Sequence, residues 1–140
     1  MNFAERVVLD TSTLVSAAIR VGSIPHQAFL KAMGSYEVCA SAETLHELNE
    51  VLLRPKFNRY LARSERDTFL ELYESYAVLV EVRESVKASR DPRDDKFLAL
   101  VAACGASVLV SSDKDLLVLK SFKSIPIIKA ADFLVFEPER

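Results

Sequence analysis

The sequence of 140 residues has few glycines, cysteines and histidines and no tryptophan. With 3 Gly, 50% hydrophobic residues and 27% charged residues, the composition excludes a disordered or low-complexity chain. Cys39 and Cys104 stand far apart without a CxxC spacing, which favours two small buried thiols in a reducing compartment over a disulfide or a zinc site. His26 and His46 are single and unpaired in the sequence, so we assign them surface or packing roles.

The sequence also lacks a long apolar run and an excess of positive charge. No run approaches the ~20 apolar residues that a membrane span needs, and the first residues, MNFAERVVLD, lack the basic-then-apolar layout of a signal peptide. The formal net charge of −2 predicts no general surface for polyanions, so any nucleic-acid contact must come from a local basic patch. We therefore expect a cytoplasmic protein that makes no contact with membranes.

Short apolar segments alternate with longer helical ones along the chain, whose length is typical of one domain. The apolar segments predict strands at residues 6–11, 36–41, 78–82, 107–112 and 125–130. The longer segments predict helices at residues 12–19, 24–34, 42–53, 55–62, 64–77, 92–105 and 113–122. We therefore expect a single domain over residues 1–140, a three-layer α/β/α sandwich around a mostly parallel sheet of about five strands.

Polar residues at the helix starts predict where the helices are capped. Thr11 or Ser12 is placed to cap the first helix. Ser64 opens the helix at residues 64–77 with Asp67 three residues later, which is the spacing of a capping box.

Aspartates follow the first and fourth predicted strands and lie at the start of the long helix at residues 92–105. They are Asp10, Asp91, Asp94, Asp95, Asp113 and Asp115. In parallel α/β folds, ligands bind outside the carboxyl ends of the strands. Aspartate is also a common helix cap, so each of these acids taken singly is equally compatible with a capping role.

Glu47 differs because it lies inside the helix predicted at residues 42–53, where no capping role is available. At about 100° per residue, one apolar arc of this helix is formed by Leu45, Leu48, Val51 and Leu52. Glu47 falls at the border of the arc, about 40° from Val51, so its carboxylate is expected to point along the edge of the core toward the sheet. The alternative is a snorkelling or salt-bridged glutamate.

The carboxylates at the strand ends and on the helix at residues 42–53 are expected to converge in one cleft. Such a cluster repels itself and raises the pKa of its members unless a cation neutralises it. Oxygen ligands without nearby histidine or cysteine select a hard ion such as Mg²⁺ or Mn²⁺. Because such an ion activates water and neutralises a leaving oxygen, the predicted chemistry is hydrolysis of a nucleic-acid backbone.

Three segments in this order, VVLDTSTLVSA, SAETLHELNEVL and DPRDDKFLALVAACGASVLVSSDKDLL, resemble the PIN-domain ribonucleases, in particular the bacterial PIN-family toxins related to VapC. The resemblance covers nearly the whole chain and implies an α/β/α sandwich around a parallel sheet. It also implies a Mg²⁺- or Mn²⁺-dependent endonuclease that cuts single-stranded RNA as the toxin of a toxin-antitoxin pair. A small antitoxin protein that occupies the site, and a homodimer, are the further partners that the resemblance implies.

Carried over position by position, the resemblance implies four catalytic and metal-binding acids, which are Asp10, Glu47, Asp94 and Asp113. Asp95 is the alternative to Asp94, since the two are adjacent, and Asp91 is a third option. The spacing from Asp94 to Gly105, which ends the helix, matches the family and favours Asp94.

Hydroxyl residues next to the acids in the family correspond to Thr11 and Ser112, which are implied to orient ligands or water. The sequence has no evident basic stripe for RNA. The segment RPKFNRYLAR is the best candidate for steering RNA, and a solvated helix face is the alternative for it. The possible RNA contacts are Arg54, Lys56, Arg59 and Lys114.

Two other protein classes, one of enzymes and one of regulators, have functional acids near the first strand. A phosphohydrolase of the haloacid-dehalogenase type also has an aspartate at the end of the first strand, but its phosphatase branch usually has an acid two positions later, where this sequence has Ser12. Lys129 could serve as the lysine that a phosphoacceptor receiver domain has after its fifth strand, but the paired acids of that class are missing. A non-catalytic binding module that keeps the fold also remains open.

Overall fold

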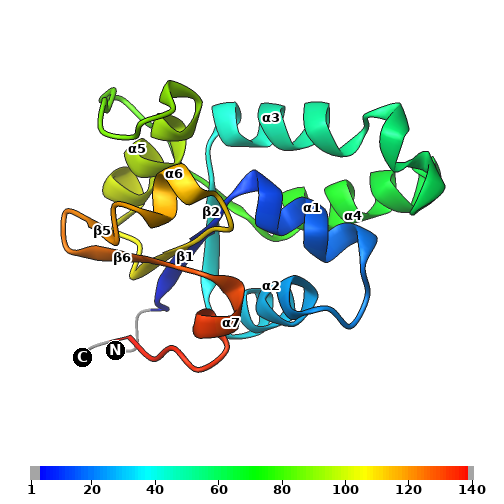
Figure 1. Cartoon of the computed structure of the whole chain (residues 1–140), viewed down its shortest axis with the longest axis horizontal. Coiled ribbons are helices and arrows are strands. Elements are labelled where there is room, and N and C mark those ends of the chain that lie inside the picture. Colours follow the sequence, from blue (N-terminus) through cyan, green and yellow to red (C-terminus); the bar gives the residue numbers. More distant parts are fainter. Residues whose placement is uncertain (1–3, 139–140) are drawn as a thin grey trace.

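The structure, a computed structural model, describes residues 4–138. It has three layers, with one sheet between two layers of helices (Figure 1). The strand order is β3-β2-β1-β4-β6-β5. Every neighbouring pair is parallel except β5 and β6, which are antiparallel. The α/β/α sandwich with a mostly parallel sheet that the sequence predicts is confirmed. Residues 1–3, which belong to the segment examined for a signal peptide, lie outside the described residues.

The strands are short and mostly apolar. Their bounds are β1 (Arg6–Leu9), β2 (Glu37–Ala40), β3 (Val78–Leu79), β4 (Val108–Val110), β5 (Ser121–Phe122) and β6 (Ile125–Ile128). In the centre, Val7 of β1 pairs with Val38 of β2 on one side and with Val108 of β4 on the other. Because β1, β2, β4 and β6 are parallel, their carboxyl ends meet at the same edge of the sheet.

The helices lie on both faces of the sheet. Their bounds are α1 (Thr11–Ile19), α2 (Ile24–Ser35), α3 (Ala42–Leu52), α4 (Arg63–Tyr76), α5 (Asp95–Cys104), α6 (Lys114–Leu117) and α7 (Ala130–Phe133), with the 3₁₀ turns η1 (Pro55–Arg59) and η2 (Pro92–Asp94). Within residues 4–138, none of these helices combines the length and the apolarity that crossing a bilayer requires.

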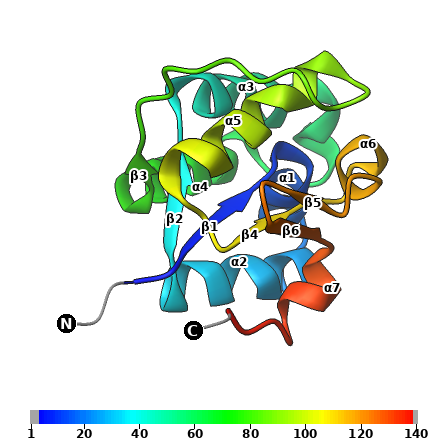
Figure 2. The same ribbon diagram turned by 90° about the vertical axis from the view of Figure 1, so that its left-hand side faces the viewer.

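Alternate residues of the strands pack into two cores. Val7 and Leu9 of β1 lie in the core that includes residues of α1, α2, α3, α4 and α7. Val8 faces the opposite way, into the core beneath α5 and α6, where Leu98 and Leu109 are also buried. Figures 1 and 2 show α5 on one side of the central strands and α1, α2 and α4 on the other. Cys39 and Cys104 are buried free thiols, as the sequence predicts.

The sheet has one strand more than the sequence analysis expects. The helix predicted at residues 113–122 ends at Leu117, and β5 follows it as one arm of a hairpin with β6. The turn of this hairpin holds Lys123 and Ser124 at φ values of 49° and 67°, as a two-residue turn with left-handed residues requires. Neither residue is a glycine or asparagine, so the usual sequence signal of such a turn is absent. The strand predicted at residues 78–82 is also shorter, because regular pairing ends at Leu79.

Two of the predicted helix caps are wrong. The side chain of Asp10, rather than Thr11 or Ser12, caps α1 by accepting a hydrogen bond from the Thr13 amide at 2.9 Å. The helix α4 begins one residue before Ser64, after Ala62, and no side chain caps it. The predicted end of the long helix is correct, since Gly105 adopts the left-handed conformation at φ 65° directly after α5.

Candidate metal centre

Four acidic residues line one cleft at the carboxyl edge of the sheet. Asp10 follows β1, Asp113 follows β4, Asp94 ends η2 beside α5, and Glu47 lies in the middle of α3. The cleft has a volume of about 410 Å³. Its lining comprises Asp10, Thr11, Ser12, Val15, Ser16, Ile19, Glu47, Val51, Phe57, Asp94, Phe97 and Asp113. The structure therefore brings together the four acids that the family resemblance selects.

Asp10 is held rigidly and is almost fully buried. Its side chain is a cap for α1, and the residue is 2% exposed. The Ser111 hydroxyl donates to its Oδ2 at 2.5 Å and the Ser12 hydroxyl to its Oδ1 at 3.0 Å. Burial raises the pKa of the Asp10 carboxyl, while the hydrogen bonds from Ser111, Thr13 and Ser12 act in the opposite direction. The donors thus fix the orientation of a carboxylate that water barely reaches.

Asp94 has the most unfavourable surroundings of these acids. Among the buried side-chain polar atoms of residues 4–138, its Oδ2 is the one without a hydrogen-bond partner. Burial, followed by the charge of Asp113 and a hydrogen bond with that residue, raises the pKa of Asp94 to about 7. Although Asp94 precedes α5, its side chain makes no capping hydrogen bond. A structural role as a helix cap therefore does not explain this buried acid.

The orphaned oxygen of Asp94 leads to a prediction about stability. An Asp94→Asn substitution keeps the shape of the side chain and an amide donor for Asp113, but removes the buried charge. Because the fold raises the pKa of Asp94, the folded protein binds a proton that the unfolded chain releases, and stability falls as the pH rises from about 4 to about 7. In EDTA at pH 8, we expect Asp94→Asn to gain at least about 1 kcal/mol, or roughly 3 °C in Tm.

Thermal melts of the two proteins in EDTA at several pH values test this expectation. The difference in Tm between Asp94→Asn and wild type should grow between pH 4 and pH 7 and then level off. A lower Tm for Asp94→Asn at pH 8 would mean that the carboxylate stabilises the metal-free fold, contrary to the burial and the repulsion described above.

Asp113 combines a structural and a cleft-facing role. Its Oδ1 accepts from the Asp115 amide at 2.8 Å and so caps α6, as the capping alternative predicts. The Ser111 hydroxyl, which donates to Asp10, also accepts from the Asp113 amide at 2.9 Å. Ser111 thereby links the acids that follow β1 and β4. Capping occupies one oxygen of Asp113, and the residue still lines the cleft beside Asp94.

Both carboxylate oxygens of Glu47 have partners. The Thr11 hydroxyl donates to Oε1 at 2.5 Å, and the Lys96 ammonium donates to Oε2 at 2.5 Å. Glu47 points toward the cleft, as its place on the helix predicts, but the structure also has it in the salt bridge that the alternative proposes. Sequence reasoning did not single out Lys96.

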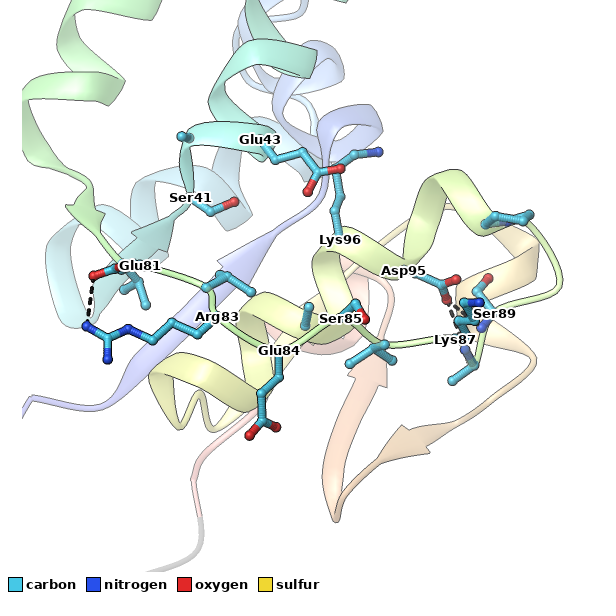
Figure 3. Close-up of a pocket in the computed structure, with 17 residues that line it drawn as sticks. Ser41, Glu43, Glu81, Arg83, Glu84, Ser85, Lys87, Ser89, Asp95 and Lys96 are labelled. Carbon is cyan, nitrogen blue, oxygen red and sulfur yellow. Dashed lines mark hydrogen bonds and ion pairs between the residues drawn. The ribbon is translucent and has the colours of Figure 1, made fainter.

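Asp95 lies apart from the cleft although it is adjacent to Asp94. Its Oδ1 accepts from the backbone amides of Ala88 and Ser89, at 3.1 and 2.8 Å, and so fastens the loop at residues 80–91 to α5. Figure 3 shows this side chain beside Ser89, in a second pocket that Lys96 also lines. Of the two adjacent acids, the structure therefore places Asp94 and not Asp95 with the other acids.

A second group of acids shares Asp94. The carboxylate oxygens of Asp91, Asp94 and Asp115 lie within 4.8 Å of one another, which is close enough to hold a metal ion. The outer two are already paired, since Arg93 contacts Asp91 at 2.8 Å and Arg90 contacts Asp115 at 2.9 Å. Asp94 therefore stands between two neutralised acids on one side and the cleft on the other.

The hydroxyl residues at the site form a chain that ends on Asp10. Ser112, which the resemblance implies, lies 2.6 Å from the Ser12 hydroxyl, and Ser12 donates to Asp10. Thr11 contacts Glu47 and not Asp10. Ser111 makes the shortest hydrogen bond to Asp10, at 2.5 Å, but it is not among the residues predicted from the sequence. Which hydroxyl of the pair at residues 111–112 faces Asp10 depends on the register of the strand, and the sequence alone does not give that register.

The candidate RNA-contacting residues lie next to the cleft. Arg54, Lys56 and Arg59 are exposed on and before η1, and Phe57 of the same turn lines the cleft. Lys114 is exposed directly after Asp113. Arg66, which is fully buried, fixes this region by donating to the carbonyl oxygens of Leu52, Arg54 and Leu61 and to the Asn58 side chain.

The chemistry of these donors fits a hard divalent cation. The cleft offers carboxylate and hydroxyl oxygens, and neither histidine nor cysteine lines it. A buried carboxylate oxygen without a partner, on a residue whose pKa is raised by burial and then by neighbouring acids, is the arrangement that a bound cation would relieve. Asp10, Asp94 and Asp113 are the residues that would hold it, because in the part of the chain described here none of them is in an ion pair.

Comparisons with known proteins identify the family and the fold. The family model for the PIN domain matches residues 6–115. The toxin VapC20 of Mycobacterium tuberculosis, described as cleaving the sarcin-ricin loop, is 14% identical, with a TM-score of 0.55 over 86% of this chain and 98% of its own. The protein PAE2754 of Pyrobaculum aerophilum is 16% identical, with a TM-score of 0.63 over 94% of this chain and 88% of its own. No curated protein sequence matches the chain significantly.

Proposed function

Because the chain belongs to the PIN domain family, whose model matches residues 6–115, we propose that it is a Mg²⁺- or Mn²⁺-dependent endonuclease that hydrolyses single-stranded RNA. The observation that supports this most strongly is the partnerless Oδ2 of Asp94, buried in a cleft that Asp10 and Asp113 also line. An acid in such surroundings destabilises the metal-free fold, so its presence in a cleft favours a functional role over a structural one.

The ion would be held by Asp10, Asp94 and Asp113. When bound, such an ion lowers the pKa of a water ligand and neutralises negative charge on a phosphodiester. Asp10 contributes a carboxylate fixed by Ser111 and Ser12, so little reorganisation is needed at the centre of the site. Asp94 would bind the ion as a carboxylate, and because burial raises its pKa to about 7, binding would be favoured at a pH above that value.

The surroundings of the cleft suit a single strand of RNA better than a small phosphorylated metabolite. Phe57 of η1 lines the cleft, and Lys56 and Arg59 are exposed on the same turn, where they can attract an extended polyanion. A net charge of −2 means that these local cations, with Arg54 and Lys114, must supply the attraction for the phosphates.

The cellular role follows from the family only by analogy. We propose that the chain is the toxin of a toxin-antitoxin pair in the cytoplasm, a single domain that forms a homodimer and is held inactive by an antitoxin protein. The similarity to VapC20, whose description names it a toxin, supports this part of the proposal. Membership of the PIN family does not favour the haloacid-dehalogenase or receiver alternatives, and Lys129, which precedes α7, does not line the acidic cleft.

An RNA cleavage assay tests the proposal. Purified protein should cut a labelled single-stranded RNA in the presence of 1 mM Mn²⁺ or Mg²⁺, and excess EDTA should abolish the cut completely. A fresh addition of Mn²⁺ should restore it. Absence of cleavage in either metal across a panel of RNAs would favour the non-catalytic binding module.

A further inference from the structure

Lys96 occupies an unfavourable position for a cation. It lies in the first turn of α5, where the helix dipole disfavours positive charge, and its side chain is 11% exposed. Exposed positions would cost less for an ammonium group, which is strongly hydrated. Stability of the helix alone therefore does not account for a lysine here.

Two acceptors hold the ammonium in this position. Lys96 donates to Oε2 of Glu47 at 2.5 Å and to the carbonyl oxygen of Arg93. Figure 3 shows the side chain rising from α5 toward α3, the helix that carries Glu47. An ammonium has three N–H donors, so one remains after these two bonds. Glu47, in turn, is oriented by the Thr11 hydroxyl at its other oxygen.

Lys96 is also the innermost of three regularly spaced cations. Arg90, Arg93 and Lys96 pair with Asp115, Asp91 and Glu47 respectively. The side chains of the two arginines are 61% and 85% exposed, whereas that of Lys96 is 11% exposed. The outer pairs therefore screen acids at the surface. Lys96 lines the second pocket and not the cleft itself, and it brings a largely desolvated positive charge to Glu47, which does line the cleft.

We propose that Lys96 is a substrate-binding cation of this site, positioned by Glu47, and that its free N–H binds a phosphate oxygen of the RNA. The proposal rests on the nuclease function argued above. Glu47 is then a positioning residue in this chain, because both of its oxygens are engaged by Thr11 and Lys96. A lysine in this role neutralises charge at the phosphate without a second metal ion.

The Lys96→Met variant separates the charge from the packing of the side chain. At saturating Mn²⁺, we expect its kcat for RNA cleavage to fall about a hundredfold, as for the loss of one fixed donor. Its affinity for Mn²⁺ should rise at least about threefold, because a positive charge beside the ion is removed. Lys96→Arg, which keeps the charge, should retain at least about a tenth of the activity.

Lys87→Met serves as the matched control. Lys87 is exposed and lines the same second pocket as Lys96, but it lies in the loop at residues 80–91. Removing its charge should change neither kcat nor the affinity for Mn²⁺ by more than about twofold. Thermal melts of all variants establish that the differences do not come from unfolding.

A kcat of Lys96→Met within threefold of wild type would overturn the proposal. Weaker binding of Mn²⁺ by this variant would do so as well, since it would mean that Lys96 only supports the structure of the site. If the wild type cleaves no RNA, the proposed function fails, and the Mn²⁺ titrations still decide the electrostatic role: tighter binding supports it, and unchanged or weaker binding contradicts it.

Discussion

We expect Asp10→Asn to lose at least about a thousandfold in RNA cleavage while remaining folded. Asparagine is also a good helix cap, so it can still accept from the Thr13 amide at the start of α1. The substitution removes a buried charge whose pKa the fold raises, which makes a loss of stability in EDTA unexpected. Loss of activity would therefore report the missing carboxylate and not a damaged fold.

Single-turnover cleavage of a labelled RNA at saturating Mn²⁺ is the measurement. Asp132→Asn is the control, because Asp132 is an exposed aspartate in α7 and does not line the cleft. The control should cleave like wild type. Cleavage by Asp10→Asn at more than a tenth of the wild-type rate would refute the assignment of Asp10 to the site.

The second large effect concerns the adjacent pair Asp94 and Asp95. Asp94→Asn removes the acid with a partnerless oxygen in the cleft, and its cleavage rate should also fall at least about a thousandfold. Asp95→Asn changes an acid whose oxygen holds the amides of Ala88 and Ser89, so it should keep cleavage within about threefold. We expect Asp95→Asn instead to loosen the attachment of the loop at residues 80–91 to α5.

The two variants carry the same change at neighbouring positions, so each is the control of the other. Amide hydrogen exchange at Ala88 and Ser89 should become faster in Asp95→Asn and stay unchanged in Asp94→Asn. If Asp95→Asn were the inactive variant and Asp94→Asn the active one, the choice between the two acids would be reversed.

The sequence predicts much of the frame that carries the site. Strand patterns before Asp10 and Asp113, together with the rule that parallel strands end at one edge, are enough to place these acids near each other. The apolar arc of α3 places Glu47 at the border of the core, which the structure confirms. These features are local and periodic, so they can be read without knowledge of distant contacts.

Other features depend on contacts between distant segments. The partner of Glu47 is Lys96, 49 residues away, and no local pattern indicates which of several lysines meets it. The use of Asp95 as an anchor is visible only once the loop at residues 80–91 folds over α5. The hairpin of β5 and β6 lacks the usual turn residues, since Lys123 and Ser124 adopt left-handed conformations there without glycine or asparagine.

The most direct test of the central claim is a calorimetric titration of Mn²⁺ into wild type, Asp10→Asn and Asp91→Asn. Asp10 belongs to the cleft, whereas Asp91 belongs only to the outer group with Asp94 and Asp115. If the ion lies in the cleft, Asp10→Asn binds Mn²⁺ at least about tenfold more weakly and Asp91→Asn stays within about threefold of wild type. Normal binding by Asp10→Asn with weakened binding by Asp91→Asn would contradict this claim and would place the ion in the outer group.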